Sequence, residues 1–212
     1  LTSFAEGWPL ISGAPWDVLL IQESRLVRGS KPYLEAVATI QGLGAVLVRG
    51  EVGPGGTCLV AYVCRRGRLR VHGPLGVGPL ERSLCATWYP GGVPPLHLAN
   101  LYCDATGSTA ARVETNGMLA AALAHVESMG DVPALICGDL NQLMEELPVS
   151  AALQLAGWQD LGDEPTSRGY NSRRPRRIDV MLASPAVRDR VGSAHLTWDY
   201  ALSVHAYQWA VI

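Results

Sequence analysis

The chain has 212 residues, of which 48% are hydrophobic and 17% are charged, and its formal net charge is −2 at pH 7. Such a length allows a single domain with a substantial core, and the near-neutral charge excludes a global basic field for nucleic acid. No apolar run reaches the length of a membrane span, and the start of the chain lacks the features of a signal peptide. We therefore expect an intracellular protein, nuclear or cytoplasmic, without a membrane partner.

The predicted elements are short and are separated by turn residues, in keeping with 23 glycines and 14 prolines. Apolar segments predict strands at 17–23, 44–49, 57–64, 69–73, 83–89, 96–103, 133–139, 177–184 and 207–212. Helices are predicted at 108–129 and near 150–156. Because strand follows strand in the middle of the chain, the pattern favours an α+β fold in which two packed sheets have helices outside.

The five cysteines, at 58, 64, 85, 103 and 137, contain no C-x-x-C pair and no metal-ligand spacing. Most of them lie within the apolar strand-like segments. This pattern indicates buried, reduced thiols.

Polar side chains stand where several predicted strands end. Glu23 closes the first strand, Tyr102 lies near the end of the sixth, and Asp139 and Asn141 follow the apolar stretch of "ALICGDLNQ". A carboxylate at the edge of an apolar core is costly unless it is paired or binds a cation. If these strand ends converge on one rim, their oxygen atoms suit a hard divalent cation, Mg²⁺ before Zn²⁺.

Two further residues complete a catalytic hypothesis. Asp179 lies within the strand at 177–184, and His205 precedes the last strand. A histidine beside an aspartate has a fixed tautomer and a stabilised cation, and a metal ion with such a histidine suits attack of water on a phosphate ester. Taken singly, each residue has a structural alternative: a good turn sequence at 138–141, or a surface ion pair of Asp179 with Arg177. The combination favours the functional interpretation.

Six segments in this order resemble the motifs of the endonuclease/exonuclease/phosphatase superfamily. They are "DVLLIQES", "LANLYCDATG", "CGDLNQ", "GWQDLGDEPT", "RRIDVMLAS" and "LSVHAYQWAVI". The resemblance covers almost the whole chain, and it implies a mostly antiparallel, four-layer α/β/β/α sandwich formed by one domain at 1–212.

The resemblance also implies roles for the polar residues. Catalytic roles fall on Tyr102, Asp139, Asn141, Asp179 and His205, and the metal-binding role falls on Glu23. Mg²⁺ is the implied cofactor, with Mn²⁺ as the alternative. Asp139 would act on the attacking water, Asn141 and Tyr102 would contact the phosphate, and Asp179 would orient the ring of His205.

The sequence departs from the family in two places. The family's first strand carries an Asn, and "LTSF" resembles the residues just after it, so we expect an N-terminally truncated domain. The terminal motif reads Ser203-Val204-His205, where the family has an acid at the middle position. Val204 cannot coordinate a metal ion, so both departures are expected to weaken metal binding.

The segment "SRRPRR" at 172–177 is a basic cluster in the loop that leads to Asp179. Arg173, Arg174, Arg176 and Arg177 are predicted to bind a polyanion backbone, with a solvated turn as an equal alternative. The resulting hypothesis is a Mg²⁺-dependent phosphodiesterase, favouring a DNA endonuclease of retroelement or abasic-site type, monomeric or part of a polyprotein. The alternatives are a small phosphomonoesterase and an impaired relic that binds nucleic acid or protein.

Overall fold

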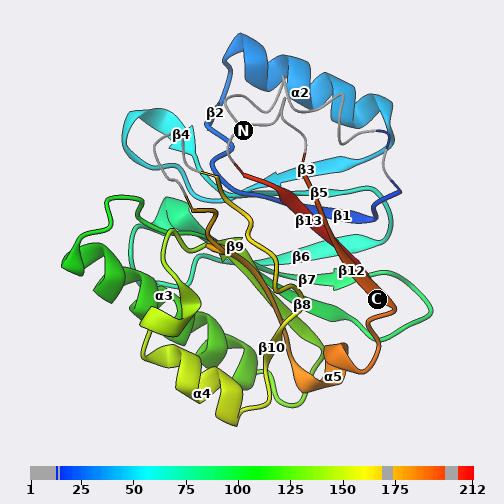
Figure 1. Ribbon diagram of the computed structural model, residues 1–212. Helices are drawn as coiled ribbons and strands as arrows, with labels where there is room; N and C mark the ends of the chain where they lie inside the picture. The colour runs from blue at the N-terminus through cyan, green and yellow to red at the C-terminus, as the bar shows by residue number, and fades with distance from the viewer. Residues whose placement is uncertain (1–12, 14, 169–173, 199–204) are drawn as a thin grey trace.

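The computed structural model describes residues 13, 15–168, 174–198 and 205–212. Its layers run from helix α2 (Lys31–Gly42), through a three-stranded and then a six-stranded sheet, to the helices α3 (Thr109–Glu127) and α4 (Val149–Leu155) (Figure 1). The predicted four-layer α/β/β/α arrangement is therefore confirmed.

The three-stranded sheet is antiparallel and carries the first part of the site. Its order is β1 (Val18–Ile21), β5 (Ala61–Cys64) and β3 (Val46–Arg49). Helix α2 covers its outer face, where Ala36 and Ile40 pack into a cluster with Ile21 and Val63. The side chain of Ser30 caps this helix by accepting a hydrogen bond from the backbone N–H of Tyr33.

The six-stranded sheet carries the rest of the site. Its order is β10 (Gln159–Asp160), β11 (Asp179–Ala183), β9 (Ala134–Asp139), β8 (Leu96–Tyr102), β7 (Ser83–Tyr89) and β6 (Arg68–Gly73). Neighbouring strands are antiparallel except β8 and β9, which are parallel and are joined through α3. The parallel register brings Tyr102 beside Asp139 at one end of the sheet.

The remaining elements are short. They are β2 (Leu26–Val27) paired with β4 (Thr57–Cys58), the hairpin of β12 (Ser193–Thr197) and β13 (Tyr207–Val211), helix α5 (Pro185–Arg188), and the 3-10 helices Pro54–Gly56, Leu80–Arg82 and Met144–Glu146. Within the described ranges, no helix combines the length and the apolar character that crossing a membrane requires.

A buried amide ties the two sheets together near the ends of β1 and β8. The Nδ2 group of Asn100 donates to the carbonyls of Ile21 at 3.0 Å and Ala61 at 3.1 Å, and Gln22 donates to its Oδ1 at 2.5 Å. Asn100 is fully buried, so these bonds satisfy a group that would otherwise be costly inside the core. They fix the strand that leads to Glu23 against the strand that ends at Tyr102.

The predicted strands and both predicted helices are present, with one correction. The expected single strand at 57–64 is two strands, because β4 pairs with β2 whereas β5 pairs with β1 and β3. Helix α2 and strand β12 were not predicted. The five cysteines are buried and free, as expected.

Candidate active site

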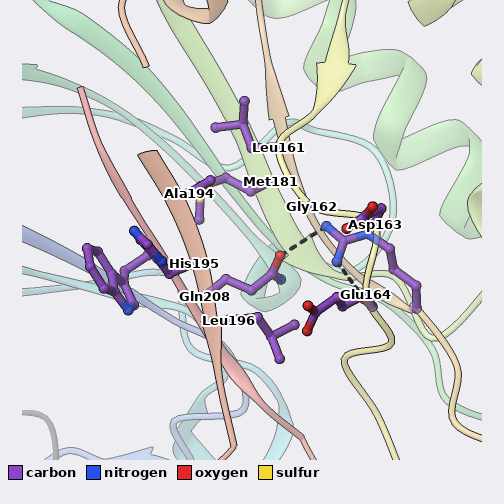
Figure 2. A pocket seen from close by; sticks show the side chains of 11 residues that line it. Leu161, Gly162, Asp163, Glu164, Met181, Ala194, His195, Leu196 and Gln208 are labelled. Atoms are coloured by element: carbon purple, nitrogen blue, oxygen red, sulfur yellow. Dashed lines mark hydrogen bonds between the residues drawn. The ribbon is translucent and has the colours of Figure 1, made fainter. Parts of the chain in front are cut away.

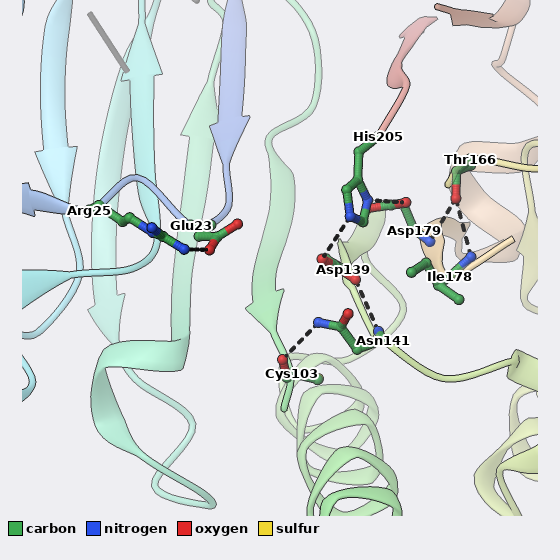
Figure 3. Close-up of polar contacts among 9 residues, drawn as sticks. All are labelled: Glu23, Arg25, Cys103, Asp139, Asn141, Thr166, Ile178, Asp179 and His205. Carbon is green, nitrogen blue, oxygen red and sulfur yellow. Dashed lines mark hydrogen bonds and ion pairs between the residues drawn. The ribbon is translucent and has the colours of Figure 1, made fainter. Parts of the chain in front are cut away.

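Asp179 and His205 form a hydrogen-bonded pair at the start of β11 (Figure 3). The Nδ1–H group of His205 donates to the Asp179 carboxylate, with oxygens at 3.0 and 3.2 Å. The backbone around Asp179 is held in turn by Thr166, whose hydroxyl accepts from the N–H groups of Ile178 at 3.1 Å and Asp179 at 3.0 Å. The imidazole is thereby fixed in one tautomer, with Nε2 facing away from Asp179.

Asp139 ends β9 directly opposite Asp179 in the antiparallel register. One of its carboxylate oxygens lies 4.0 Å from Nε2 of His205, and the three side chains offer ligand atoms that all lie within 4.8 Å of one another. Asp139 is buried, which favours its protonated form.

The electrostatics of this trio follow from burial and from two neighbouring carboxylates. Burial, followed by the charge of Asp179, raises the pKa of Asp139 to about 7, although His205 and the backbone N–H of Asn141 oppose this shift. Burial alone would lower the pKa of His205, but its hydrogen bond to Asp179 and the charges of Asp179 and Asp139 outweigh burial and raise it. The site therefore combines a carboxyl group that exchanges its proton near neutral pH with an imidazole stabilised as a cation.

The turn after β9 explains the sequence Gly-Asp-Leu-Asn. The Asp139 carboxylate accepts from the backbone N–H of Asn141 at 3.0 Å, and Asn141 donates from Nδ2 to the carbonyl of Cys103 at 3.0 Å. Asn141 has a φ of 53°, which asparagine tolerates better than most residues. A Cβ atom at Gly138 would lie 2.3 Å from the carbonyl oxygen of Leu101, so the close approach of β8 and β9 requires glycine here.

Glu23 and Tyr102 lie at the same end of the sandwich as Asp139. Burial raises the pKa of Tyr102 to about 12, with further contributions from the charges of Glu23 and Asp139. Glu23 forms an ion pair with Arg25 and lies across the site from the Asp139–His205 trio in Figure 3. Glu23 is not within the group of close ligand atoms formed by that trio.

Backbone strain is concentrated at this end of the molecule. Among the described residues, positive φ outside glycine occurs at Glu23 (51°), Arg25 (48°) and Asn141 (53°). Such conformations are costly and persist where the surrounding structure determines them, frequently at functional sites.

The predicted basic cluster divides into parts with different surroundings. Arg173 lies outside the described residues, whereas Arg174 and Arg176 are exposed. Arg177 binds Asp160 through two hydrogen bonds of 2.6 and 2.7 Å and also donates to the side chain of Gln208 at 3.0 Å. These partners give Arg177 a structural role, and its contact with substrate stays a prediction. Val204 also lies outside the described residues.

A cavity of about 210 Å³ lies between the β10–β11 edge and the β12–β13 hairpin (Figure 2). Its lining includes Arg177, Gln208, Met181, His195 and Trp209. The ring of His195 stacks on Trp209 with centroids 4.2 Å apart. The cavity lining does not include Asp139, Asp179 or His205, so the trio belongs to a separate site.

The sequence profile of the Endonuclease/Exonuclease/phosphatase family matches residues 9–201. The chain belongs to this family. A comparison with curated proteins at the sequence level finds no match.

Solved structures of this family share the fold. A 3′-5′ exonuclease from Neisseria meningitidis is 22% identical with a TM-score of 0.73, and 100% of this chain and 96% of that chain are covered. An AP endonuclease from Archaeoglobus fulgidus is 18% identical with a TM-score of 0.72, covering 96% and 91%. The endonuclease domain of TRAS1, a telomere-specific non-LTR retrotransposon, is 16% identical with a TM-score of 0.71, covering 96% and 88%.

Three residues of the site were not assigned a role from the sequence. Thr166 belongs to the segment "GWQDLGDEPT", so the motif marked its position without revealing that its hydroxyl holds the backbone of Asp179. Asn100 belongs to "LANLYCDATG" in the same way. Arg25 lies two residues after Glu23, and no sequence signal indicated that it would pair with that carboxylate.

Proposed function

We propose that the chain is a divalent-metal-dependent phosphodiesterase, and that it acts as a DNA endonuclease of the retroelement or abasic-site type. The observation that carries the proposal is the trio of Asp139, Asp179 and His205 with mutual ligand distances within 4.8 Å. Glu23, Tyr102 and Asn141 border the same trio.

In this proposal Asp139 accepts the proton of the attacking water. A general base works best when its pKa lies near the operating pH, and the pKa of Asp139 is raised to about 7. His205, oriented by Asp179 at 3.0 Å, contributes a cationic Nε2–H group toward the phosphate. Charge stabilisation of this kind lowers the barrier because the donor is already positioned when negative charge develops.

Asn141 and Tyr102 provide neutral donors. One of the two Nδ2 protons of Asn141 is used on the carbonyl of Cys103, which orients the amide and directs the second proton away from that strand. The raised pKa of Tyr102 keeps its hydroxyl protonated at neutral pH, so it is available as a donor to a phosphate oxygen.

The donor set fits a hard divalent cation. The charges of Asp179 and Glu23 both raise the pKa of Asp139, which shows that carboxylates at this rim repel one another. A bound cation would relieve that repulsion. Glu23 would hold Mg²⁺, with Mn²⁺ as the alternative, through its carboxylate oxygens. When bound, the ion supplies charge neutralisation at the phosphate.

The proposed substrate is DNA, bound in part by the exposed Arg174 and Arg176. The backbone of Arg176 pairs with Ser167, and Ser167 also bridges to His205, so the basic loop adjoins the trio. The similar structures include an exonuclease, an AP endonuclease and a retrotransposon endonuclease domain. A Bacteroides thetaiotaomicron phosphatase is also similar, so phosphomonoester hydrolysis is the second candidate.

The decisive experiment measures cleavage of supercoiled plasmid, an abasic duplex and a small phosphomonoester over a range of Mg²⁺ and Mn²⁺ concentrations. We expect metal-dependent nicking of DNA that falls by roughly 10²–10⁴-fold in His205→Ala. His195→Ala is the matched control, because His195 lies on the separate cavity. Hydrolysis of the monoester alone would favour the second candidate, and binding of DNA without cleavage at any metal concentration would indicate an impaired relic.

The role of the missing acid can be tested in the same assay. If the acid that the family carries before the histidine strengthens the metal site, Val204→Asp should lower the Mg²⁺ concentration needed for half-maximal cleavage. His205→Ala in the same background should remove the gain. An unchanged Mg²⁺ requirement in folded Val204→Asp protein would show that this position does not contribute to the site.

A further inference from the structure

Three of the five histidines lie close together, far from the candidate active site of Asp139, Asp179 and His205. His72 comes from β6, His97 from β8 and His125 from the last turn of α3. The ring centroids of His72 and His97 are 6.2 Å apart, and those of His72 and His125 are 5.8 Å apart. Their side chains are exposed or half-buried, so an ion in solution can reach all three.

The sheet register explains why these rings meet. Thr87 on β7 lies directly opposite His97 on β8 and opposite Arg70 on β6. The β6–β7 register shifts between Val71 and Gly73, which leaves His72 as the extra residue of a bulge. Side chains two residues apart on a strand share a face, so His72 lies on the same face of the sheet as Arg70 and Thr87.

A single buried hydroxyl links two of the rings. The Thr87 Oγ1 atom lies 2.6 Å from Nε2 of His72 and 2.9 Å from Nδ1 of His97. Two ring nitrogens from different strands therefore point at one location on the sheet. The ring of His125, from α3, lies beside the ring of His72.

The surroundings favour the neutral imidazole. Burial lowers the pKa of all three histidines, and the neighbouring histidines, together with Arg70 beside His72, lower the pKa of His72 and His97 further. Neutral imidazole is the form that coordinates a metal. His125 also lies at the C-terminus of the long helix α3, where the helix dipole favours positive charge.

We propose that His72, His97 and His125 form a binding site for a divalent transition-metal ion of the Zn²⁺ type. Three nitrogen ligands suit Zn²⁺, Ni²⁺ and Cu²⁺ rather than Mg²⁺. His97 and Tyr102 lie at opposite ends of β8, which separates the two sites by roughly 16 Å at about 3.3 Å per residue. The proposed site is therefore independent of the catalytic rim.

Binding requires the three rings to rearrange, because their ligand nitrogens do not all lie within 4.8 Å of one another. A Zn–N bond is about 2.0–2.1 Å long, whereas both ring nitrogens now lie at hydrogen-bond distance from the Thr87 hydroxyl. The rings of His72 and His97 must turn from that hydroxyl toward a shared ion. His72 is exposed on the edge strand β6, so its ring has the freedom to make this movement.

The test is calorimetric titration of untagged protein with Zn²⁺, supported by the visible spectrum of the Co²⁺ complex. We expect one Zn²⁺ per chain at this site, which excess Mg²⁺ does not displace. His72→Ala, His97→Ala and His125→Ala should each weaken it by at least about tenfold, because each removes a ligand. His195→Ala is the matched control and should leave binding unchanged.

Zn²⁺ can also reach the catalytic carboxylates, so the titration is repeated with His205→Ala and Asp139→Asn. Retention of the Zn²⁺ site in both variants supports the proposal. Loss of binding in those variants, or unchanged binding in folded His72→Ala, would overturn it. His72→Ala is the key variant, because an exposed edge residue can be removed without loss of the fold, whereas the His97 and His125 variants require a check of folding by circular dichroism.

Discussion

The replacement Asp139→Asn should stabilise the protein above neutral pH while it removes activity. Burial and the charge of Asp179 raise the pKa of Asp139 from 3.8 to about 7, a shift that corresponds to about 4 kcal/mol between the two charge states. The folded state therefore binds this proton more tightly than the unfolded state. The contribution of Asp139 to the free energy of unfolding therefore falls as pH rises from 3.8 to about 7, and it is constant above pH 7.

Asparagine has nearly the same shape and can still accept the hydrogen bond from the backbone N–H of Asn141, which is 3.0 Å long. It removes the buried charge but also removes the favourable Asp139–His205 interaction. We expect a net gain of roughly 1–3 kcal/mol at pH 8, which corresponds to a rise in Tm of roughly 3–9 °C for a domain of this size.

The assay is thermal unfolding of the wild type and the variant from pH 4 to pH 8.5 without added metal. The two curves should converge near pH 4 and separate through neutral pH, and DNA cleavage by the variant should fall by about 10²–10⁴-fold. Asp131→Asn, in an exposed turn, is the matched control and should show no such separation. An Asp139→Asn variant that melts below the wild type at pH 8 would show that the ionised, buried Asp139 does not destabilise the folded protein.

Three further changes probe the remaining parts of the site. Glu23→Gln should raise the Mg²⁺ concentration needed for cleavage and leave thermal stability within about 1 kcal/mol, because its ion pair with Arg25 is partly exposed; an unchanged Mg²⁺ titration would exclude Glu23 as a ligand. Gly138→Ala should destabilise the protein by about 1–3 kcal/mol in urea unfolding, because its Cβ would collide with the backbone of Leu101; a neutral effect would contradict the close strand approach. Asn100→Leu should lower the free energy of unfolding in urea by at least about 2 kcal/mol, because two buried carbonyls lose their donor. An equally stable variant would show that the amide does not join the sheets.

The strand ends of the site could be predicted because their signals are local. The apolar run before Gly138 and the asparagine after Asp139 define a strand and its turn within a few residues, and the structure has that turn closed by an Asp139–Asn141 hydrogen bond. Helix α2 was missed because Val37, Thr39 and Ile40 are β-branched and interrupt the helical pattern. Its cap at Ser30 is clear only once the element is known.

Long-range partners could not be predicted from the sequence. Arg177 stands in a run of arginines, and that run gave no sign that Asp160 and Gln208 would bind its guanidinium group. The approach of Glu23 to the Asp139 rim depends on the packing of two sheets, which the amide of Asn100 helps to fix. The cluster of His72, His97 and His125 depends on the pairing of β6, β7 and β8 and on the packing of α3.

Hydrogen bonds of the dipeptide Thr166–Ser167 connect the basic loop to the segment of His205. Its backbone pairs on one side with Arg176, through bonds of 2.8 to 2.9 Å, and on the other with the segment of His205, where the N–H of Ala206 donates to Thr166 at 2.7 Å. The hydroxyl of Thr166 also accepts hydrogen bonds from the backbone N–H groups of Ile178 and Asp179 at the start of β11. These hydrogen bonds join the backbone of Arg176 to the segments of both Asp179 and His205, so a displacement of the basic loop is expected to shift both members of the pair.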